Sequence, residues 1–150
     1  MNLVKHPDPF LKSPTEEVTL PTSDENKIII QNMITLMYLD NGIGLAANQA
    51  GYNKRIFVMD VSNERNHAQV FINPVITSKN NKKVNHMEGC LSCPGELVTV
   101  KRSITVDLEW TCKHGKRQHK TFSYLPGKVV QHEMDHLNGK LIIDEKKFKI

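Results

Sequence analysis

The chain has 150 residues, 39% of them hydrophobic and 24% charged, so it can bury a core without disulfides and suits one domain spanning 1–150. Its net charge of +4 is too small to indicate nucleic-acid binding, and we expect no DNA partner. The sequence has neither an apolar run long enough to cross a bilayer nor an apolar signal core, so we expect no membrane partner and no export. Three cysteines in such a chain favour a reducing, cytoplasmic setting.

The first long periodic segment runs from Thr22 to Asp40 and predicts a helix. Thr22 and Glu25 have the spacing of a capping box, and Asn41-Gly42 supplies a helix stop. Hydrophobic residues between these ends recur at helical spacing: Ile29, Ile30, Met33, Ile34 and Met37.

Short runs rich in β-branched residues follow and predict strands at 55–61, 69–76, 97–102, 103–110 and 116–125. Residues 113–116 predict a hairpin turn between the last two. A second helix is predicted from Pro126 to Asn138, with Ser123 as a candidate cap and Gly139 after its end. Strands grouped between helices favour an α+β fold.

The second predicted helix carries the pattern HExxH. His132 and His136 are one turn apart on one helical face, so both rings can reach a single metal ion. Glu133 lies beside them and could act as general base toward a water molecule. Because a catalytic metal usually has three protein ligands and one open position, the chain must supply a third ligand elsewhere.

Cys90 is the best candidate for the third ligand, because a thiolate binds zinc or ferrous iron strongly. It follows Gly89, which permits a close approach of the backbone to a ligand. The rival interpretation is a closed structural zinc site in a non-enzymatic module, built from Cys90, Cys93, His132 and His136. That interpretation leaves Glu133 without a purpose, and the separation between the two pairs is far longer than in a zinc finger.

A third motif, Gly42–Gln49, follows the first helix and contains little side-chain bulk. Such a segment can pair its backbone with an extended peptide, and Gln49 offers an amide donor. Taken alone, the motif is more often a site of close backbone packing.

The three motifs together resemble those of peptide deformylase, which are GxGxAAxQ, EGCLS and QHExDHLxG. They occur here as Gly42–Gln49, Glu88–Ser92 and Gln131–Gly139, in the family's order and with its approximate spacing. The resemblance implies antiparallel strands packed around the HExxH helix. It also implies a hydrolase that removes the formyl group from N-formylmethionine of new polypeptides. A peptidase that uses the same HExxH chemistry on internal peptide bonds is the alternative activity.

The resemblance also implies roles for particular residues. Cys90, His132 and His136 would bind one divalent metal, and Glu133 would transfer the proton of the activated water. Gln49 and the Leu91 backbone N–H would stabilise the oxyanion. Glu88 would pair with Arg102 beside the metal loop, and an exposed pair would contribute little. The substrate would be held by the backbone of Ile43, Gly44 and Gly89 and by a methionine pocket of Leu125, Val129 and the His132 face.

Ligand types do not fix the metal: the family implies Fe²⁺ in vivo, and Zn²⁺, Ni²⁺ or Co²⁺ could replace it in purified protein. The expected partners are N-formylmethionyl nascent peptides, and a monomer in the cytoplasm is expected, in the host-cell cytoplasm if the chain is virus-encoded.

The chain departs from the family pattern at Cys93, Leu97 and Lys128. We interpret Cys93 as core or pocket wall, and we expect Leu97 and Lys128 to shift substrate preference. Because only 145–150 follow the last predicted element, we expect no C-terminal helix, as in some compact members encoded by bacteriophages, and weak ribosome binding.

Overall fold

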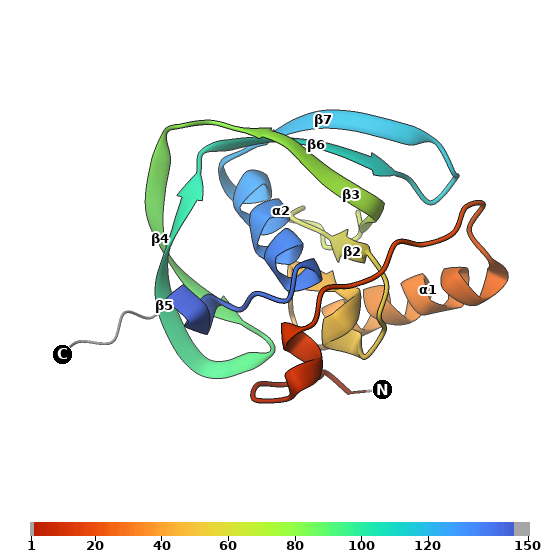
Figure 1. Cartoon of the computed structure of the whole chain (residues 1–150), viewed down its shortest axis with the longest axis horizontal. Coiled ribbons are helices and arrows are strands. Elements are labelled where there is room, and N and C mark those ends of the chain that lie inside the picture. The colour runs from red at the N-terminus through yellow and green to blue at the C-terminus, as the bar shows by residue number, and fades with distance from the viewer. Residues whose placement is uncertain (1, 146–150) are drawn as a thin grey trace.

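An antiparallel sheet and a long hairpin lie around the second helix in the computed structural model, which describes residues 2–145 (Figure 1). Within those residues the strands of the sheet are ordered β1-β2-β3-β6-β7, and β4 pairs with β5. The strands are β1 Gly44–Ala46, β2 Ile56–Met59, β3 Gln69–Lys79, β4 Lys83–Cys90, β5 Cys93–Ser103, β6 Thr105–Thr111 and β7 Arg117–Ser123. The helices are α1 Asp24–Leu39 and α2 Tyr124–Leu137, with 3-10 turns η1 Pro9–Lys12, η2 Ala47–Ala50 and η3 Ile142–Glu145.

The N-cap of helix α1 lies one residue later than the sequence predicts. Ser23 is the N-cap, and its hydroxyl accepts a hydrogen bond from the Asn26 N–H at 3.1 Å. The predicted capping box at Thr22 is therefore wrong, because the neighbouring serine is the residue with extended backbone at the helix entry. The predicted stop is confirmed, since Asp40 caps the helix and Asn41 has a φ of 56°.

Helix α2 begins at Tyr124, two residues before the predicted Pro126, and Ser123 is its N-cap residue without a side-chain hydrogen bond. Gly127 allows the helix to start against the sheet, because a Cβ there would lie 2.8 Å from the Phe122 carbonyl oxygen. The predicted end is confirmed at Asn138, followed by Gly139 with a φ of 77°.

The predicted α+β fold with antiparallel strands and two helices is confirmed, and the hairpin turn at 113–116 joins β6 to β7. The sequence prediction missed β1, which is very short, and β4, most of whose residues are exposed. Figure 1 shows β3, β6 and β7 across the top, the β4–β5 hairpin at the left, and α2 between them.

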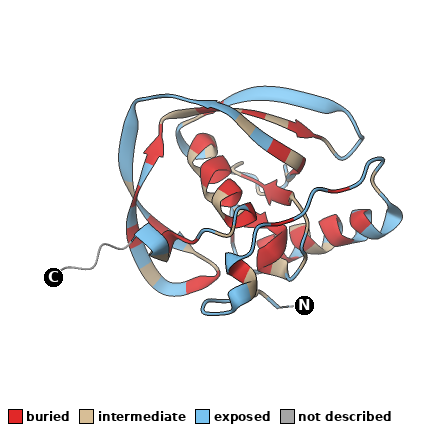
Figure 2. Cartoon of the chain, in the orientation of Figure 1, coloured by how far each residue is buried: buried red, intermediate tan, exposed pale blue. Residues whose placement is uncertain are grey.

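Two buried clusters position the helices. Side chains of α1 pack on β1 and β2, and those of α2 pack on the sheet around Phe57, Phe71 and Phe122. Figure 2 shows buried residues along α1, α2 and the strands between them, whereas β7 is largely exposed. Burial therefore fixes α2 from several sides.

No helix within residues 2–145 has the length and apolar character required to cross a membrane. The predicted chain end from residue 146 onward lies outside the described residues.

Candidate metal centre and active site

Three side chains from two elements meet at one point. The Cys90 Sγ lies 3.2 Å from the His136 Nε2, which lies 3.1 Å from the His132 Nε2. All three candidate ligand atoms lie within 4.8 Å of one another. The histidines lie on successive turns of α2, and Cys90 ends β4 just before the turn into β5. The structure thus brings together the three residues that the sequence singled out as metal ligands.

His132 is held by a buried carboxylate. The His132 Nδ1 lies 2.9 Å from Glu88, which in turn accepts two hydrogen bonds from Arg102 at 2.9 and 3.0 Å. Burial raises the pKa of Glu88, but the hydrogen bonds from His132 and Arg102 outweigh it and lower the pKa to about 2. The ionised carboxylate therefore fixes the ring so that the Nε2 points toward Cys90 and His136.

The predicted pair of Glu88 and Arg102 forms, and it is buried. Its side chains are only 4% and 7% exposed, and Arg102 also contacts Asp135 on α2 at 2.6 Å. Removing one partner of such a pair would leave a buried charge unpaired.

His136 is enclosed behind the cavity. Burial lowers its pKa well below the ordinary value, so the ring is neutral and its Nε2 lone pair is available to a cation. Asn48 donates a hydrogen bond to the His136 carbonyl at 2.6 Å, which ties η2 to the end of α2.

Glu133 is 3% exposed and lies against Gly44 of β1. A Cβ at Gly44 would be only 2.7 Å from the Glu133 Oε2, so this close approach requires glycine. Burial raises the pKa of Glu133 to about 7, against the opposing charges of His132 and Arg102. A carboxyl group with that pKa can both accept and donate a proton near neutral pH.

Gln49 is oriented by two hydrogen bonds. Its Oε1 accepts from the Ala46 N–H at 2.9 Å, and its Nε2 donates to the Ser92 hydroxyl at 3.1 Å. The same Nε2 lies 3.7 Å from the Cys90 Sγ. Because the amide nitrogen has two hydrogens, Gln49 can donate one hydrogen bond to Ser92 and a second to a ligand in the site.

An open cavity of about 610 Å³ lies above this cluster. His136 lies behind it, and the cavity wall includes the other sequence-predicted site residues: Ile43, Gly44, Gln49, Gly89, Cys90, Leu91, Leu125, Val129, His132 and Glu133. The wall also includes the three residues that depart from the family pattern, Cys93, Leu97 and Lys128. Cys93 is 2% exposed and packs among apolar residues, as core or pocket wall should.

Sequence reasoning missed several residues that orient the site. Ser92, which accepts a hydrogen bond from Gln49, is part of the EGCLS motif, and that motif was the one sequence feature that pointed to it. Gln131 accepts from the Ser103 N–H at 3.0 Å and donates to the Ser103 carbonyl at 2.9 Å, which joins α2 to β5. Asp135 is likewise a motif residue, whereas Met87 and Glu96 line the cavity without any sequence signal.

The chain is similar to known proteins in both sequence and fold. A family model described as polypeptide deformylase matches residues 1–149. A peptide deformylase of Stenotrophomonas maltophilia (strain K279a) is 42% identical over 147 residues, covering 95% of this chain and 84% of the relative. The solved structure of a probable peptide deformylase from Synechococcus phage S-SSM7 has a TM-score of 0.92 at 36% identity, covering 97% of this chain and 99% of that chain. A peptide deformylase from Synechococcus elongatus, solved in complex with actinonin, has a TM-score of 0.92 at 35% identity. The match covers 99% of this chain and 80% of that chain.

Proposed function

Because the chain belongs to the peptide deformylase family, whose enzymes remove the N-terminal formyl group from nascent peptides, we propose that it does so with one divalent metal and Glu133. The observation that carries this proposal is the cluster of Cys90, His132 and His136, of which the first two line the cavity together with Glu133.

The residues present fit a divalent cation. His136 is neutral, and the Nδ1 of His132 is engaged by Glu88, so each ring can offer its Nε2. The hydrogen bond with Cys93 and burial raise the pKa of the Cys90 thiol, so a bound cation would be needed to keep a thiolate there. Three protein ligands beside a cavity leave room for substrate.

A divalent metal bound there would act as a Lewis acid, polarising the formyl carbonyl and lowering the pKa of water. Glu133 takes a proton from the attacking water as its oxygen bonds to the formyl carbon. It then delivers that proton to the leaving amine nitrogen as the carbon–nitrogen bond breaks, giving formate and a free N-terminus. A pKa of about 7 suits both halves of this transfer.

The formyl oxygen gains negative charge when water adds. We assign the Gln49 amide and the Leu91 backbone N–H as its donors, because both residues line the cavity beside Cys90. Ser92 holds the Gln49 amide before substrate arrives, so little reorganisation is needed. One such donor typically contributes about 100- to 1,000-fold to turnover.

The substrate backbone would pair with the exposed backbone of Ile43, Gly44 and Gly89 on the two sides of the cavity. Leu125 and Val129, near the start of α2, would contact the methionine side chain. Lys128 lies in the same wall, and its aliphatic stem would line the pocket.

We propose that the native metal is Fe²⁺, that the enzyme is a monomer and that it is located in the cytoplasm.

The test compares hydrolysis of formyl-Met-Ala with that of acetyl-Met-Ala, using protein purified without oxygen and assayed for metal. We expect formate release from the first peptide only, whereas cleavage of internal peptide bonds would indicate a peptidase.

The Glu133→Gln variant is the control for mechanism. It should keep the metal and lose roughly 100- to 10,000-fold in kcat, because the proton carrier is gone while all three ligand atoms remain. Loss of metal together with activity, or a fully active variant, would contradict the role given to Glu133.

A further inference from the structure

Cys90 and Cys93 face each other across the β4–β5 hairpin. Their Cα atoms are register partners at the closed end of the ladder, with Leu91 and Ser92 forming the turn between them. Paired residues of an antiparallel ladder point to the same face, with Cα atoms roughly 4.5 to 5.5 Å apart. A disulfide requires Cα atoms about 4.4 to 6.8 Å apart, so the backbone already has the needed spacing.

The two residues also share the state and the surroundings that a disulfide needs. Both are free thiols. Both line the 610 Å³ cavity, so a small solute that enters the substrate site reaches both. The third cysteine, Cys112, follows β6 and is not part of the cavity wall, which makes it a control within the same chain.

Packing alone does not account for Cys93. It belongs to a buried apolar cluster with Val98 and Leu141, in which an alanine or valine would pack equally well. An apolar filler would not need a thiol on the residue directly opposite Cys90 in the ladder.

We propose that Cys90 and Cys93 form a reversible disulfide when a hydroperoxide enters the cavity, and that this bond protects Cys90 from irreversible oxidation. With hydrogen peroxide, the Cys90 sulfur attacks one peroxide oxygen, the O–O bond breaks, and one water molecule departs, so that Cys90 becomes a sulfenic acid. The Cys93 sulfur then attacks the Cys90 sulfur, the S–O bond breaks, and a second water leaves. Two thiols are oxidised by two electrons in total, and hydrogen peroxide is reduced to two water molecules.

The disulfide would also switch the enzyme off, a consequence that rests on the proposed function. Once the Cys90 sulfur is bonded to Cys93, it carries no thiolate charge and no longer binds a cation. The metal would lose one of its three protein ligands and dissociate. A dithiol reductant returns two electrons, restores both thiols and lets the metal rebind.

The test treats the zinc-loaded full-length protein with a small excess of hydrogen peroxide, then alkylates the remaining thiols and digests with trypsin. Both cysteines fall in the single peptide 84–101, because that stretch contains no internal lysine or arginine. We expect this peptide to be lighter by two hydrogens and unalkylated, and to recover two thiols, zinc binding and activity after dithiothreitol.

Matched variants separate protection from simple reactivity. Cys93→Ala should accumulate sulfinic or sulfonic acid at Cys90 that dithiothreitol does not reverse, whereas Cys112→Ser should behave as the wild type. A wild-type peptide 84–101 with Cys90 oxidised and Cys93 still alkylated would overturn the proposal, and so would equal recovery of Cys93→Ala.

The wild-type mass measurement requires no variant, so the proposal stays testable if a variant fails to fold. A disulfide that forms while zinc stays bound would support the disulfide and contradict Cys90 as a metal ligand.

Discussion

Gly44 decides where the Glu133 carboxyl group can lie. A methyl group at this position would fall 2.7 Å from the Glu133 Oε2 and 2.9 Å from the Val129 Cγ1. Contacts of that length force a neighbour to move, and α2 holds the backbone of both neighbours. The absence of a side chain at Gly44 is therefore part of the catalytic geometry.

We predict that Gly44→Ala lowers kcat/KM by about 100-fold, because a displacement near 1 Å at a reacting group costs on that order. Metal content should be unchanged, since the three ligand atoms are not contacted. Wild-type kinetics for Gly44→Ala would argue against this account.

Arg102 joins three elements at one buried point. It lies on β5, pairs with Glu88 on β4, and reaches Asp135 on α2. Since Glu88 holds His132, the same guanidinium group supports both the hairpin and the metal site.

We predict that Arg102→Met lowers the free energy of unfolding by about 3 to 5 kcal/mol, because it leaves the buried Glu88 carboxylate unpaired. It should also weaken metal binding by roughly 10- to 100-fold. Urea denaturation and metal titration measure the two effects. Lys27→Met is the control, because the Lys27–Asp24 pair is 63% and 99% exposed and should contribute less than about 1 kcal/mol. Similar losses for both variants would contradict the role of Arg102.

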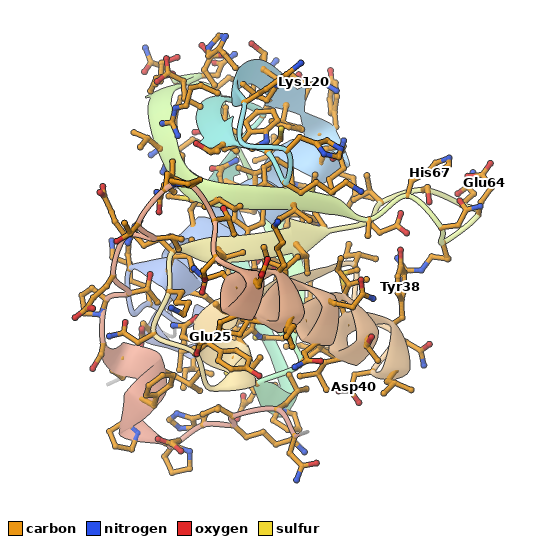
Figure 3. All side chains as sticks on the ribbon, turned by 90° about the vertical axis from the view of Figure 1, so that its right-hand side faces the viewer. Glu25, Tyr38, Asp40, Glu64, His67 and Lys120 are labelled. Atoms are coloured by element: carbon orange, nitrogen blue, oxygen red, sulfur yellow. The ribbon has the colours of Figure 1, made fainter. Side chains whose placement is uncertain are left out.

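The loop after β2 supports the segment at the start of β1 that we propose binds the substrate backbone. The Asp60 N–H donates to the Ile43 carbonyl at 2.9 Å, and Arg65 donates to the Gly42 carbonyl. Tyr38 on α1 donates to the Asp60 carboxylate at 2.5 Å. Figure 3 shows Tyr38 rising from α1 toward this loop, which projects beyond the sheet with Glu64 and His67.

The Asp60 carboxylate should make stability depend on pH. Burial would raise its pKa, but hydrogen bonds from Ser62 and Tyr38 outweigh burial and hold the pKa well below its usual range. The stabilisation is therefore fully present above the unfolded-state pKa of about 4 and is lost as pH falls toward the folded-state value.

We predict that Asp60→Asn costs about 2 to 3 kcal/mol at pH 7, and that the cost shrinks progressively below about pH 4. Urea denaturation at a series of pH values measures this, with Asp24→Asn as an exposed control. A cost that does not change with pH would show that the charge of Asp60 is unimportant.

Across the whole molecule, sequence patterns within a short segment predicted the features that depend on that segment alone. The spacing of the apolar residues identified α1, and the i, i+4 histidines identified the side chains that meet on α2. Strand β4 was missed because most of its residues are exposed, so it has no alternating apolar face.

Contacts between distant segments escaped the sequence reasoning for a different reason. Whether Glu88 and Arg102 are buried depends on how α2 covers the hairpin, and no short stretch encodes that. The contact between Gly44 and Glu133 likewise joins residues almost ninety positions apart, and only the assembled fold reveals it.

X-ray absorption spectroscopy of the zinc-loaded protein tests the central claim most directly, because it counts the sulfur ligands of the metal. We predict one sulfur at about 2.3 Å and three nitrogen or oxygen neighbours at about 2.0 to 2.1 Å, two of them with imidazole scattering. Two sulfur ligands would indicate a closed site that includes Cys93, and none would exclude Cys90; either result would contradict an open metal centre built from Cys90, His132 and His136.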